Sequence, residues 1–490
     1  MASDEFRLRV EPLLAAKREA FPYQEDAVAF VASRQSAAIF HEQGLGKTKI
    51  AIDVILRWLR EFQVDTALVI TKKGLIANWQ REFEVHSHLR PLVLSEDGKQ
   101  NYLAFTTGTR LLLGHYEVAR KEERRLRAWL GSRRVGVVLD EAAKIKNPAA
   151  GLTQVYHRLA PLFAKRVIMT GTPVANRPYD VWSEIFFLDQ GATLGPDFAQ
   201  FKADHDLLPT YAHDPPAFAA YQRRLESTSE ALRHISIRET KDGGCISLPS
   251  KEYVRIVTDW EPEQHEMYRR VRDDLRVAIT QNGQLVLDNQ EAALKRLLRL
   301  VQISSNPRLI DEGYSSEPGK FRPLAELISD VIRQGEKVIV WTAFNQNVEW
   351  LAAKLSSYGA LALHGKMPME RRNQVVEWFL ENEEDRVLVA TPGAAKEGLT
   401  LTVANHVVFY DRTYSLDDYL QAQDRIHRVS QERTCFVYNL IMRDSIDEWI
   451  DALLEEKHLA ARLTQGDISR ETYAECATLS FFEVLHGILG

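Results

Sequence analysis

The stretch His41-Glu-Gln-Gly-Leu-Gly-Lys-Thr48 decides the fold, because its glycines, lysine and threonine suit a loop that holds phosphate groups. It follows the apolar run 37–40, which predicts a short buried strand, and precedes a helical apolar pattern from Ile50 to Leu59. A strand, a glycine turn and a helix in this order present backbone N–H groups and a helix N-terminus to an anion. His41 replaces the first glycine of the usual pattern, so an ordinary glycine turn remains the alternative for this stretch taken alone.

Two acidic residues end a later apolar run of the same series. Asp140 and Glu141 follow directly on 135–139, which places both at the carboxyl end of a parallel sheet, where open α/β sheets bind ligands. Asp140 would hold Mg²⁺ directly or through water, and Glu141 would polarise the attacking water. From the phosphate loop, Lys47 would reach the outer phosphates and the Thr48 hydroxyl would ligate Mg²⁺.

Bulk composition is that of an ordinary globular protein. Among 490 residues, 45% are hydrophobic and 27% charged, and the net charge of −6 argues against a cationic tail that binds nucleic acid, although a local basic groove is allowed. We find no apolar run long enough to span a bilayer and no basic, apolar start typical of a secretory signal. The scattered Cys245, Cys435 and Cys476 predict neither a metal cluster nor a disulfide framework, and hence a reducing, intracellular setting. Because no apolar run is long enough to span a bilayer, we expect no membrane partner.

Two series of short β-branched runs alternate with helical patterns, which predicts two tandem α/β lobes, each a parallel sheet covered by helices on both faces. The runs are 37–40, 66–71, 110–114, 135–140 and 166–170, and then 337–342, 360–364, 386–390, 406–410 and 435–440. We expect lobe 1 over 1–247 with a helical protrusion at about 178–236, lobe 2 over 248–464 with a helical insertion at about 262–305, and a C-terminal tail over 465–490.

Three weaker signals accompany these lobes. Thr170 and Thr172 follow another strand, and their hydroxyls could bridge the nucleotide site to the neighbouring lobe. The Gln24 amide offers the donor and acceptor that read an adenine edge, although alone it resembles a surface residue. Arg425 and Arg428, at i and i+3, would share one helical face and reach a γ-phosphate held by the other lobe; a salt-bridged surface helix is the alternative.

Taken together, these segments resemble the Swi/Snf-type family of superfamily II helicase-like DNA translocases. The resemblance covers the chain from about Pro22 to Leu463 and is most specific at 41–48, 137–147 and 421–431. Further matching segments, in order, are 22–24, 68–83, 169–176, 298–310, 363–367 and 398–411. The sequence of residues 424–428 resembles that of the distal, prokaryotic or phage members of the family more than that of chromatin remodellers.

The resemblance implies two RecA-like lobes that use ATP with Mg²⁺ and act on double-stranded DNA. It assigns contacts with ATP to Gln24, Gly44, Leu45, Gly46, Lys47, Thr48 and Gln421. It assigns catalysis to Lys47, Asp140, Glu141, Arg425 and Arg428. Coupling between the lobes would involve Thr170, Thr172 and Gly398, and the metal ligands would be Thr48 and Asp140.

The leading hypothesis is therefore a monomeric, duplex-DNA-dependent ATPase and translocase. It would work in the cytoplasm near the nucleoid, in the host cytoplasm if phage-encoded, and in the nucleus only if eukaryotic; any protein that targets it stays open. One alternative is a strand-separating helicase on DNA or RNA, with a hairpin within 241–260 as a conceivable wedge. Another is an ATP-gated DNA-binding scaffold with weak turnover, because Ala143 stands where the family usually has His and 414–416 replaces its Trp-Asn-Pro.

Overall fold

The computed structural model describes residues 14–174, 176–208, 211, 213–244, 246, 248–281, 284–285, 290–394 and 399–478. Gly398, one of the predicted coupling residues, lies outside them. The chain divides into two compact units. Lobe 1 comprises Met1–Leu208, Pro216–Ser247 and Ala460–Ala474, and lobe 2 comprises Pro209–Pro215, Leu248–Leu459 and Glu475–Gly490.

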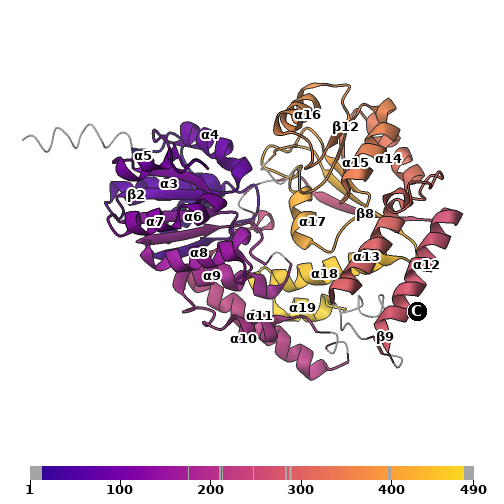
Figure 1. Cartoon of the computed structure of the whole chain (residues 1–490), viewed down its shortest axis with the longest axis horizontal. Helices are drawn as coiled ribbons and strands as arrows, with labels where there is room; N and C mark the ends of the chain where they lie inside the picture. Colours follow the sequence, from indigo (N-terminus) through magenta and orange to yellow (C-terminus); the bar gives the residue numbers. More distant parts are fainter. Residues whose placement is uncertain are drawn as a thin grey trace, which may run out of the picture. The chain divides into compact units, whose positions relative to one another are not determined.

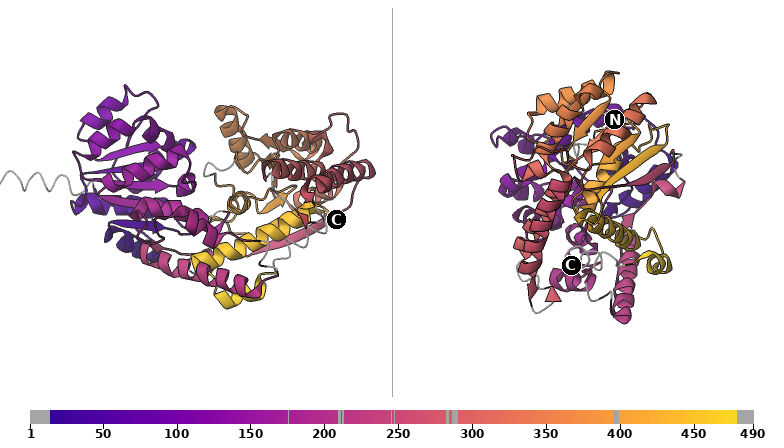
Figure 2. Two further views of the ribbon diagram at one scale, coloured as in Figure 1. Left: turned by 60° about the horizontal axis from the view of Figure 1, so that its bottom comes forward. Right: turned by 90° about the vertical axis from the view of Figure 1, so that its right-hand side faces the viewer.

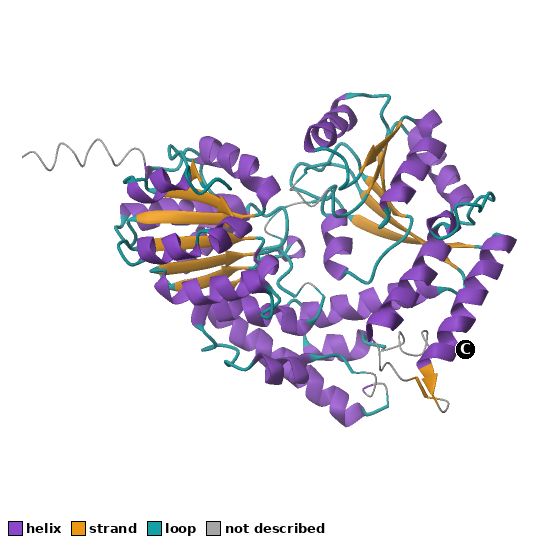
Figure 3. Ribbon diagram, in the orientation of Figure 1, coloured by secondary structure: helices purple, strands orange, loops and turns teal. Residues whose placement is uncertain are grey.

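Lobe 1 is built on a seven-stranded sheet whose recorded strand pairs are all parallel (Figure 1). Its spatial order is β3 (Leu92–Val93), β4 (Leu111–His115), β2 (Thr66–Thr71), β5 (Val135–Asp140), β6 (Lys165–Met169), β1 (Ser36–Ile39) and β7 (Ser236–Ile237). Every residue of β2 is buried, and so is every residue of β5 except the last. Strands buried on both faces need helices on both sides, and Figure 3 shows purple helices above and below this sheet.

The helices of lobe 1 follow the strands in the alternation that the sequence predicts. They are α2 (Pro22–Ala32), α3 (Lys47–Arg60), α4 (Ile76–His86), α5 (Asn101–Thr106), α6 (Tyr116–Lys121), α7 (Glu123–Leu130), α8 (Gly151–Leu159), α9 (Val181–Asp189), α10 (Phe198–His205) and α11 (Pro215–Ile235). Short 3₁₀ turns occupy Lys73–Leu75, Ala142–Ile145, Ala160–Leu162, Pro178–Asp180 and Lys241–Gly243. The apolar face of α3, from Ile50 to Leu59, packs into the main core of this lobe.

Lobe 2 contains a six-stranded sheet, again with parallel pairs throughout. Its order is β12 (Ala360–Leu363), β13 (Val387–Ala390), β11 (Val338–Trp341), β14 (His406–Phe409), β15 (Cys435–Met442) and β8 (Lys251–Thr258). The accompanying helices are α12 (Pro262–Ile279), α13 (Gln290–Ser305), α14 (Phe321–Arg333), α15 (Asn345–Lys354), α16 (Met369–Glu381) and α17 (Leu416–Gln423). A small antiparallel pair, β9 (Thr280–Gln281) and β10 (Gln284–Leu285), lies between α12 and α13. Two 3₁₀ turns, Pro307–Leu309 and Ser356–Tyr358, complete the lobe. The prediction of two α/β lobes is confirmed.

Strand β8 was not predicted, since the sequence suggests a link there with room for a wedge hairpin. The described part of 241–260 instead forms a 3₁₀ turn and a strand that pairs in parallel with β15 at the edge of the sheet. Three charged residues, Lys251, Glu252 and Arg255, interrupt the apolar residues of β8, and its residues are mostly exposed or half-buried. Such an edge strand lacks the continuous apolar run that marks a central parallel strand.

The described part of the C-terminal tail also has structure. After α18 (Ile446–Gln465), the short helix α19 (Arg470–Cys476) packs beside α11 in lobe 1 (Figure 2). Arg470 Nη1 lies 3.3 Å from Glu226 Oε2, and the Phe218 and Tyr473 rings are 5.9 Å apart. No described helix is long and apolar enough to cross a membrane.

Candidate functional site

The loop between β1 and α3 has the backbone geometry of a phosphate loop. Gly44 and Gly46 adopt positive φ angles of 91° and 73°, and Gly46 is the N-cap of α3. The positive φ requires glycine here, and a Cβ added at Gly46 would lie 2.3 Å from Gln24 Nε2, so it would also displace the Gln24 amide. The loop therefore carries the chain sharply into α3 and leaves the helix N-terminus at the carboxyl edge of the sheet.

Lys47 folds back over this loop. Its Nζ donates hydrogen bonds to the backbone carbonyls of His41, at 2.9 Å, and Glu42, at 3.1 Å. A charged phosphate oxygen is a better acceptor for an ammonium group than a neutral carbonyl. Lys47 is thus held where it could exchange these carbonyls for a phosphate, and the half-buried Thr48 follows it in the first turn of α3.

Gln24 lies against the same loop. Its Nε2 is 3.3 Å from the carbonyl of Leu45, and its Oε1 accepts from the backbone N–H of Phe21 at 3.1 Å. The neighbouring Tyr23 hydroxyl donates to the Leu45 carbonyl at 3.2 Å. Helix α2 is therefore fastened to the phosphate loop through Gln24, with both ends of its amide occupied inside lobe 1.

The buried histidine that replaces the first loop glycine is kept neutral. His41 is 1% exposed, and burial together with the nearby Lys47 ammonium lowers its pKa to about 4. Its ring lies 6.1 Å from that of Tyr23. A neutral imidazole fills the space beneath the loop without adding a second positive charge beside Lys47.

Asp140 is half-buried at the end of β5 and is held by two neighbours on adjoining elements. Its Oδ2 accepts from Thr71 Oγ1 at 2.9 Å and from Trp79 Nε1 at 2.8 Å. Burial and then the neighbouring Glu141 carboxylate raise the pKa of Asp140, while these two donors and Lys47 oppose the rise. The Tyr116 hydroxyl donates to the Asp140 carbonyl at 2.8 Å, which fixes the end of the strand.

Glu141 adopts a backbone conformation that residues with a side chain rarely accept. Its φ of 55° and ψ of 51° lie in the left-handed region, which costs of order 1–3 kcal/mol for a residue other than glycine. The strain turns the chain from β5 into the 3₁₀ turn Ala142–Ile145 and leaves the carboxylate partly accessible. Glu141 Oε2 lies 3.2 Å from Lys72 Nζ, directly after β2.

These residues fit a magnesium ion held mainly by phosphate. Among the described residues there is no cluster of three His, Cys, Asp or Glu side chains that could hold a metal unaided. Magnesium is usually bound by one or two protein oxygens together with substrate phosphates and waters. Both recorded hydrogen bonds to the Asp140 carboxylate are accepted by Oδ2. The other carboxylate oxygen is therefore suited to bind the magnesium ion together with the Thr48 hydroxyl.

The turn after β6 packs directly on the phosphate loop. A Cβ on Gly171 would lie 2.6 Å from Gln43 Cγ and 3.2 Å from Lys47 Nζ, so only glycine allows this approach. Thr170 and Thr172 flank it, both buried, and the Thr172 N–H lies 3.2 Å from Thr170 Oγ1. The structure thus brings the predicted coupling threonines to the same edge of lobe 1 as the phosphate loop.

The arginine segment of lobe 2 is not helical, and the prediction of one shared helical face is wrong. Helix α17 ends at Gln423, and Arg425 and Arg428 lie in the turns that follow. The Arg425 carbonyl accepts from the Leu401 N–H at 2.9 Å, a tertiary bond that replaces a helical one. The side chain of Gln421 is within α17, with its Nε2 2.6 Å from Asp417 Oδ1.

Both arginines lie against the loop that follows the undescribed residues 395–398. Arg425 is 3% exposed, with Nη1 3.5 Å from the carbonyl of Leu399. Arg428 Nη1 donates to Thr400 Oγ1 at 2.6 Å. The two guanidinium groups are therefore oriented by one short loop of lobe 2.

Lobe 2 places a buried carboxylate at its sheet edge, after β14. Asp411 accepts from Ser305 Oγ at 2.6 Å, Thr342 Oγ1 at 2.6 Å, the Ala343 N–H at 2.7 Å and Asn347 Nδ2 at 3.3 Å. This network joins α13, β11, α15 and β14. It holds the helical insertion onto the sheet.

Sequence reasoning found the charged residues of lobe 1 but missed the groups that hold them. Thr71 and Trp79 hold Asp140, and Lys72 holds Glu141. Strand 66–71 is followed at once by two lysines, and this signal alone could have marked the next strand end as part of the site. The aromatic donor on α4 leaves no comparable trace in the pattern.

Two family models match the chain, one after the other. The model of the SNF2-related domain matches residues 23–309, and that of the helicase conserved C-terminal domain matches 319–430. The first alone covers more than half of the chain and includes every predicted site residue of lobe 1.

Curated relatives are similar over most of this chain. An uncharacterised ATP-dependent helicase of Mycoplasma genitalium is 24% identical over 456 residues, covering 90% of this chain and 42% of the relative. The human DNA repair and recombination protein RAD54-like is 27% identical over 501 residues, covering 90% of this chain and 65% of the relative. The chain thus spans less than two thirds of the length of either relative. Among solved structures, the Sulfolobus solfataricus SWI2/SNF2 ATPase core in complex with dsDNA is 24% identical, with a TM-score of 0.42 and coverage of 94% of this chain and 97% of that one.

Proposed function

The chain belongs to the SNF2-related family of helicase-like proteins, and on this premise we propose that it is an ATPase stimulated by double-stranded DNA. Hydrolysis would drive movement along the duplex. The observation that carries the proposal is the joint presence, at one sheet edge, of a phosphate loop and the strand-end pair Asp140 and Glu141. Contact with DNA would be mainly to phosphates, and therefore insensitive to sequence and sensitive to salt.

In lobe 1 the proposed chemistry is divided between binding and activation. The loop N–H groups around Gly44, Leu45 and Gly46 would bind phosphate, and Lys47 would leave the loop carbonyls for the outer phosphates. Gln24 would contact the adenine. Glu141, which follows the strained turn of the chain, would orient and deprotonate the attacking water.

A magnesium ion held by Thr48 and Asp140 would neutralise charge that develops on the phosphates. Thr71 and Trp79 keep the Asp140 carboxylate in one orientation for that role. Because its pKa is raised, an ionised Asp140 depends on these donors and on Lys47.

We propose that lobe 2 supplies Arg425 and Arg428 as the cations that stabilise the transition state, with Gln421 beside them. Thr170, Thr172 and Gly398 would transmit the nucleotide state between the lobes. We also propose that the working unit is a monomer in the compartment that holds the DNA, the cytoplasm in a bacterial host. Light scattering after size-exclusion chromatography tests the monomer, and a stable dimer would contradict it.

The rival proposals differ from this one in what stimulates turnover. A strand-separating helicase would prefer single strands or a tailed duplex, or RNA. An ATP-gated scaffold would bind DNA with little turnover, as the replacement of the family's usual His by Ala143 allows. Ala143→His should then raise stimulation by DNA, whereas an unchanged rate would remove Ala143 as a reason for this rival.

The deciding experiment measures steady-state ATP hydrolysis with no nucleic acid, single-stranded DNA, duplex DNA and RNA. Strong stimulation by the duplex, lost in both Lys47→Ala and Glu141→Gln, would support the proposed function. Lys337→Ala serves as the matched control, because its ammonium caps carbonyls in lobe 2, far in sequence from the loop. Greater stimulation by single strands or RNA would favour the helicase. Little turnover with every nucleic acid would favour the scaffold.

Movement needs a separate readout. A triplex-forming oligonucleotide annealed at one end of the duplex is displaced by an enzyme that travels along the DNA. Displacement that depends on ATP, without separation of the duplex strands, is the expected result. Separated strands would support the helicase instead.

A further inference from the structure

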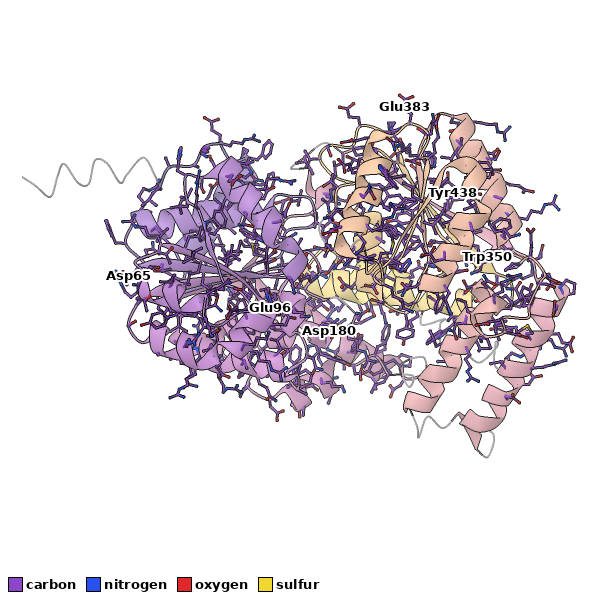
Figure 4. The ribbon with its side chains drawn as sticks, turned by 45° about the horizontal axis from the view of Figure 1, so that its top comes forward. Asp65, Glu96, Asp180, Trp350, Glu383 and Tyr438 are labelled. Carbon is purple, nitrogen blue, oxygen red and sulfur yellow. The ribbon has the colours of Figure 1, made fainter. Side chains whose placement is uncertain are left out.

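The carboxyl edge of the lobe 1 sheet is surrounded by lysine–carboxylate pairs. These pairs are Lys73 with Glu96 at 2.6 Å, Lys121 with Glu96 at 3.4 Å, Lys144 with Glu117 at 3.2 Å, and Lys146 with Asp180 at 3.5 Å. Figure 4 shows Glu96 and Asp180 on the same side of lobe 1, and Asp65, just before β2, at the opposite end. Each of these lysines thus lies beside a carboxylate, and Lys73 and Lys121 share Glu96.

One pair of this edge involves the predicted catalytic acid itself. Lys72 Nζ lies 3.2 Å from Glu141 Oε2, and the two side chains are 28% and 20% exposed. Lys72 follows β2, which is the neighbour of β5 in the sheet, so the backbone brings the two together at adjacent strand ends. The pair is part-buried, hydrogen-bonded and reachable from solvent.

We propose that Lys72 is a positioning residue that restrains Glu141 until a nucleic-acid phosphate displaces it. This inference rests on the proposed function and adds a means by which duplex DNA would stimulate hydrolysis. With Lys72 bound to a phosphate, Glu141 is released to accept a proton from the attacking water. The proton passes from water to the Glu141 carboxylate as the water oxygen attacks the γ-phosphorus and the bond to the leaving diphosphate breaks.

The energetics favour such an exchange. A partly exposed lysine–carboxylate pair contributes only about 0.2–1 kcal/mol, so holding Glu141 this way is easily reversed. A duplex presents a dense row of phosphates whose binding by lysine also releases counterions. The strained φ of Glu141 belongs to the turn and not to the ion pair, so the exchange of Lys72 acts on the side chain and leaves the turn in place.

The test compares Lys72→Met with Lys73→Met in the full chain. Both remove one positive charge from the same strand end, but Lys73 is paired with Glu96, which has no place in the proposed chemistry. Without DNA, Lys72→Met should hydrolyse ATP about 1.4-fold to fivefold faster than wild type, the range that such an ion pair can supply, with KM for ATP unchanged. Lys73→Met should keep the wild-type basal rate. The ratio of DNA-stimulated to basal rate should fall in Lys72→Met.

Salt and a conservative variant give readouts that a merely structural role would not move. Raising monovalent salt should increase the basal rate of wild type toward that of Lys72→Met and leave the variant nearly unaffected, because screening weakens the pair. Lys72→Arg, which keeps the charge, should restore the low basal rate. A basal rate in Lys72→Met equal to or below wild type would overturn the restraint.

The outcomes also separate this inference from the proposed function. If wild type is not stimulated by any nucleic acid, the proposed function fails, while the basal comparison still decides whether Lys72 restrains Glu141. If wild type is stimulated by duplex DNA and Lys72→Met shows the wild-type basal rate, only the restraint fails.

Discussion

The carboxyl edges of the two sheets each carry a hydrogen-bonded aspartate, which is half-buried in lobe 1 and buried in lobe 2. In lobe 1, Asp140 accepts two side-chain hydrogen bonds on one oxygen and is followed by Glu141 with a positive φ. In lobe 2, Asp411 accepts from three side chains and one backbone N–H, and the next residue, Arg412, is buried in an ion pair of 2.6 Å with Asp451. Burial raises the pKa of both aspartates.

The different surroundings of Asp140 and Asp411 lead us to expect the catalytic acid at the sheet edge of lobe 1. The Asp411 carboxylate of lobe 2 accepts hydrogen bonds from donors on several elements, so the residues around it hold the lobe together. The edge of lobe 1 keeps a strained residue and a partly exposed acid, features that cost stability and persist where function requires them. The two lobes share one architecture, and we expect the proposed base to act at the edge of lobe 1, whereas the buried network at the edge of lobe 2 holds that lobe together.

The largest effect is expected from Glu141→Gln, which removes the proposed base and preserves the shape of the side chain. ATP hydrolysis should fall by about 10²- to 10⁴-fold, while ATP binding and the thermal unfolding of the chain stay close to wild type. Asp411→Asn is the matched change in lobe 2 and should leave turnover close to wild type at temperatures where it remains folded. Steady-state rates and nucleotide binding measure both. Equal losses of turnover in Glu141→Gln and Asp411→Asn would contradict the assignment of catalysis to the edge of lobe 1 and of a structural role to the edge of lobe 2.

Much of this contrast could be predicted from sequence. The apolar runs at 66–71 and 135–140 are continuous because central parallel strands are buried on both faces, and they fall within one residue of the observed strands. Asp140 and Glu141 were predicted at the sheet edge for the same reason. Strand β8 could not be predicted, because an edge strand exposes one face and interrupts its apolar pattern with charges.

Tertiary contacts account for the rest. Arg425 and Arg428 have a helical spacing, but the Arg425 carbonyl accepts a hydrogen bond from the Leu401 N–H and not from a helical N–H. The sequence around the arginines does not indicate this distant contact. Lys72 and Glu141 are 69 residues apart in sequence, and they pair because strands β2 and β5 are neighbours in the sheet. Roles in binding and catalysis remain predictions for every site residue.

The second prediction concerns stability, where lobe 2 should be the more sensitive. Asp411→Ala leaves buried hydroxyl and N–H donors without their acceptor and should destabilise lobe 2 by about 3 kcal/mol. Asp140→Ala strands two donors and also removes the repulsion with Glu141, so lobe 1 should lose about 1 kcal/mol. Hydrogen exchange of β14 and β5 in the intact chain reads each lobe separately. A larger loss at β5 than at β14 would contradict the structural role assigned to the edge of lobe 2.

The third prediction sharpens the comparison through pH. The pKa of His41 is lowered to about 4 in the folded chain, so an unfolded His41 with its ordinary pKa takes up a proton first as pH falls. Its contribution to stability is intact above about pH 6.5 and is lost progressively toward pH 4. Between pH 7.5 and 5, lobe 1 should lose about 2 kcal/mol from this group.

His41→Gln should remove that part of the pH dependence, which hydrogen exchange of β1 and α3 at the two pH values can measure. His406 is the match in lobe 2. Burial lowers its pKa too, but a hydrogen bond and the charge of Glu336 oppose the shift, so His406→Gln should change the pH dependence less. An unchanged slope in His41→Gln would show that His41 is not kept neutral beneath the loop.

The smallest effect is expected where the two lobes do not differ. Each has an i,i+4 ion pair, Arg57 on α3 with the C-cap residue Glu61 at 2.8 Å, and Arg322 with Glu326 at 2.9 Å on α14. In both, the arginine precedes the glutamate, the weaker order for such a pair, and water screens the charges. A double-mutant cycle in each lobe should give a coupling energy below about 0.5 kcal/mol. A coupling energy above about 1 kcal/mol in one lobe alone would mean that surface charge, as well as the arrangement at the sheet edges, distinguishes the lobes. Values near zero in both would confine the difference to the residues around Asp140 and Asp411.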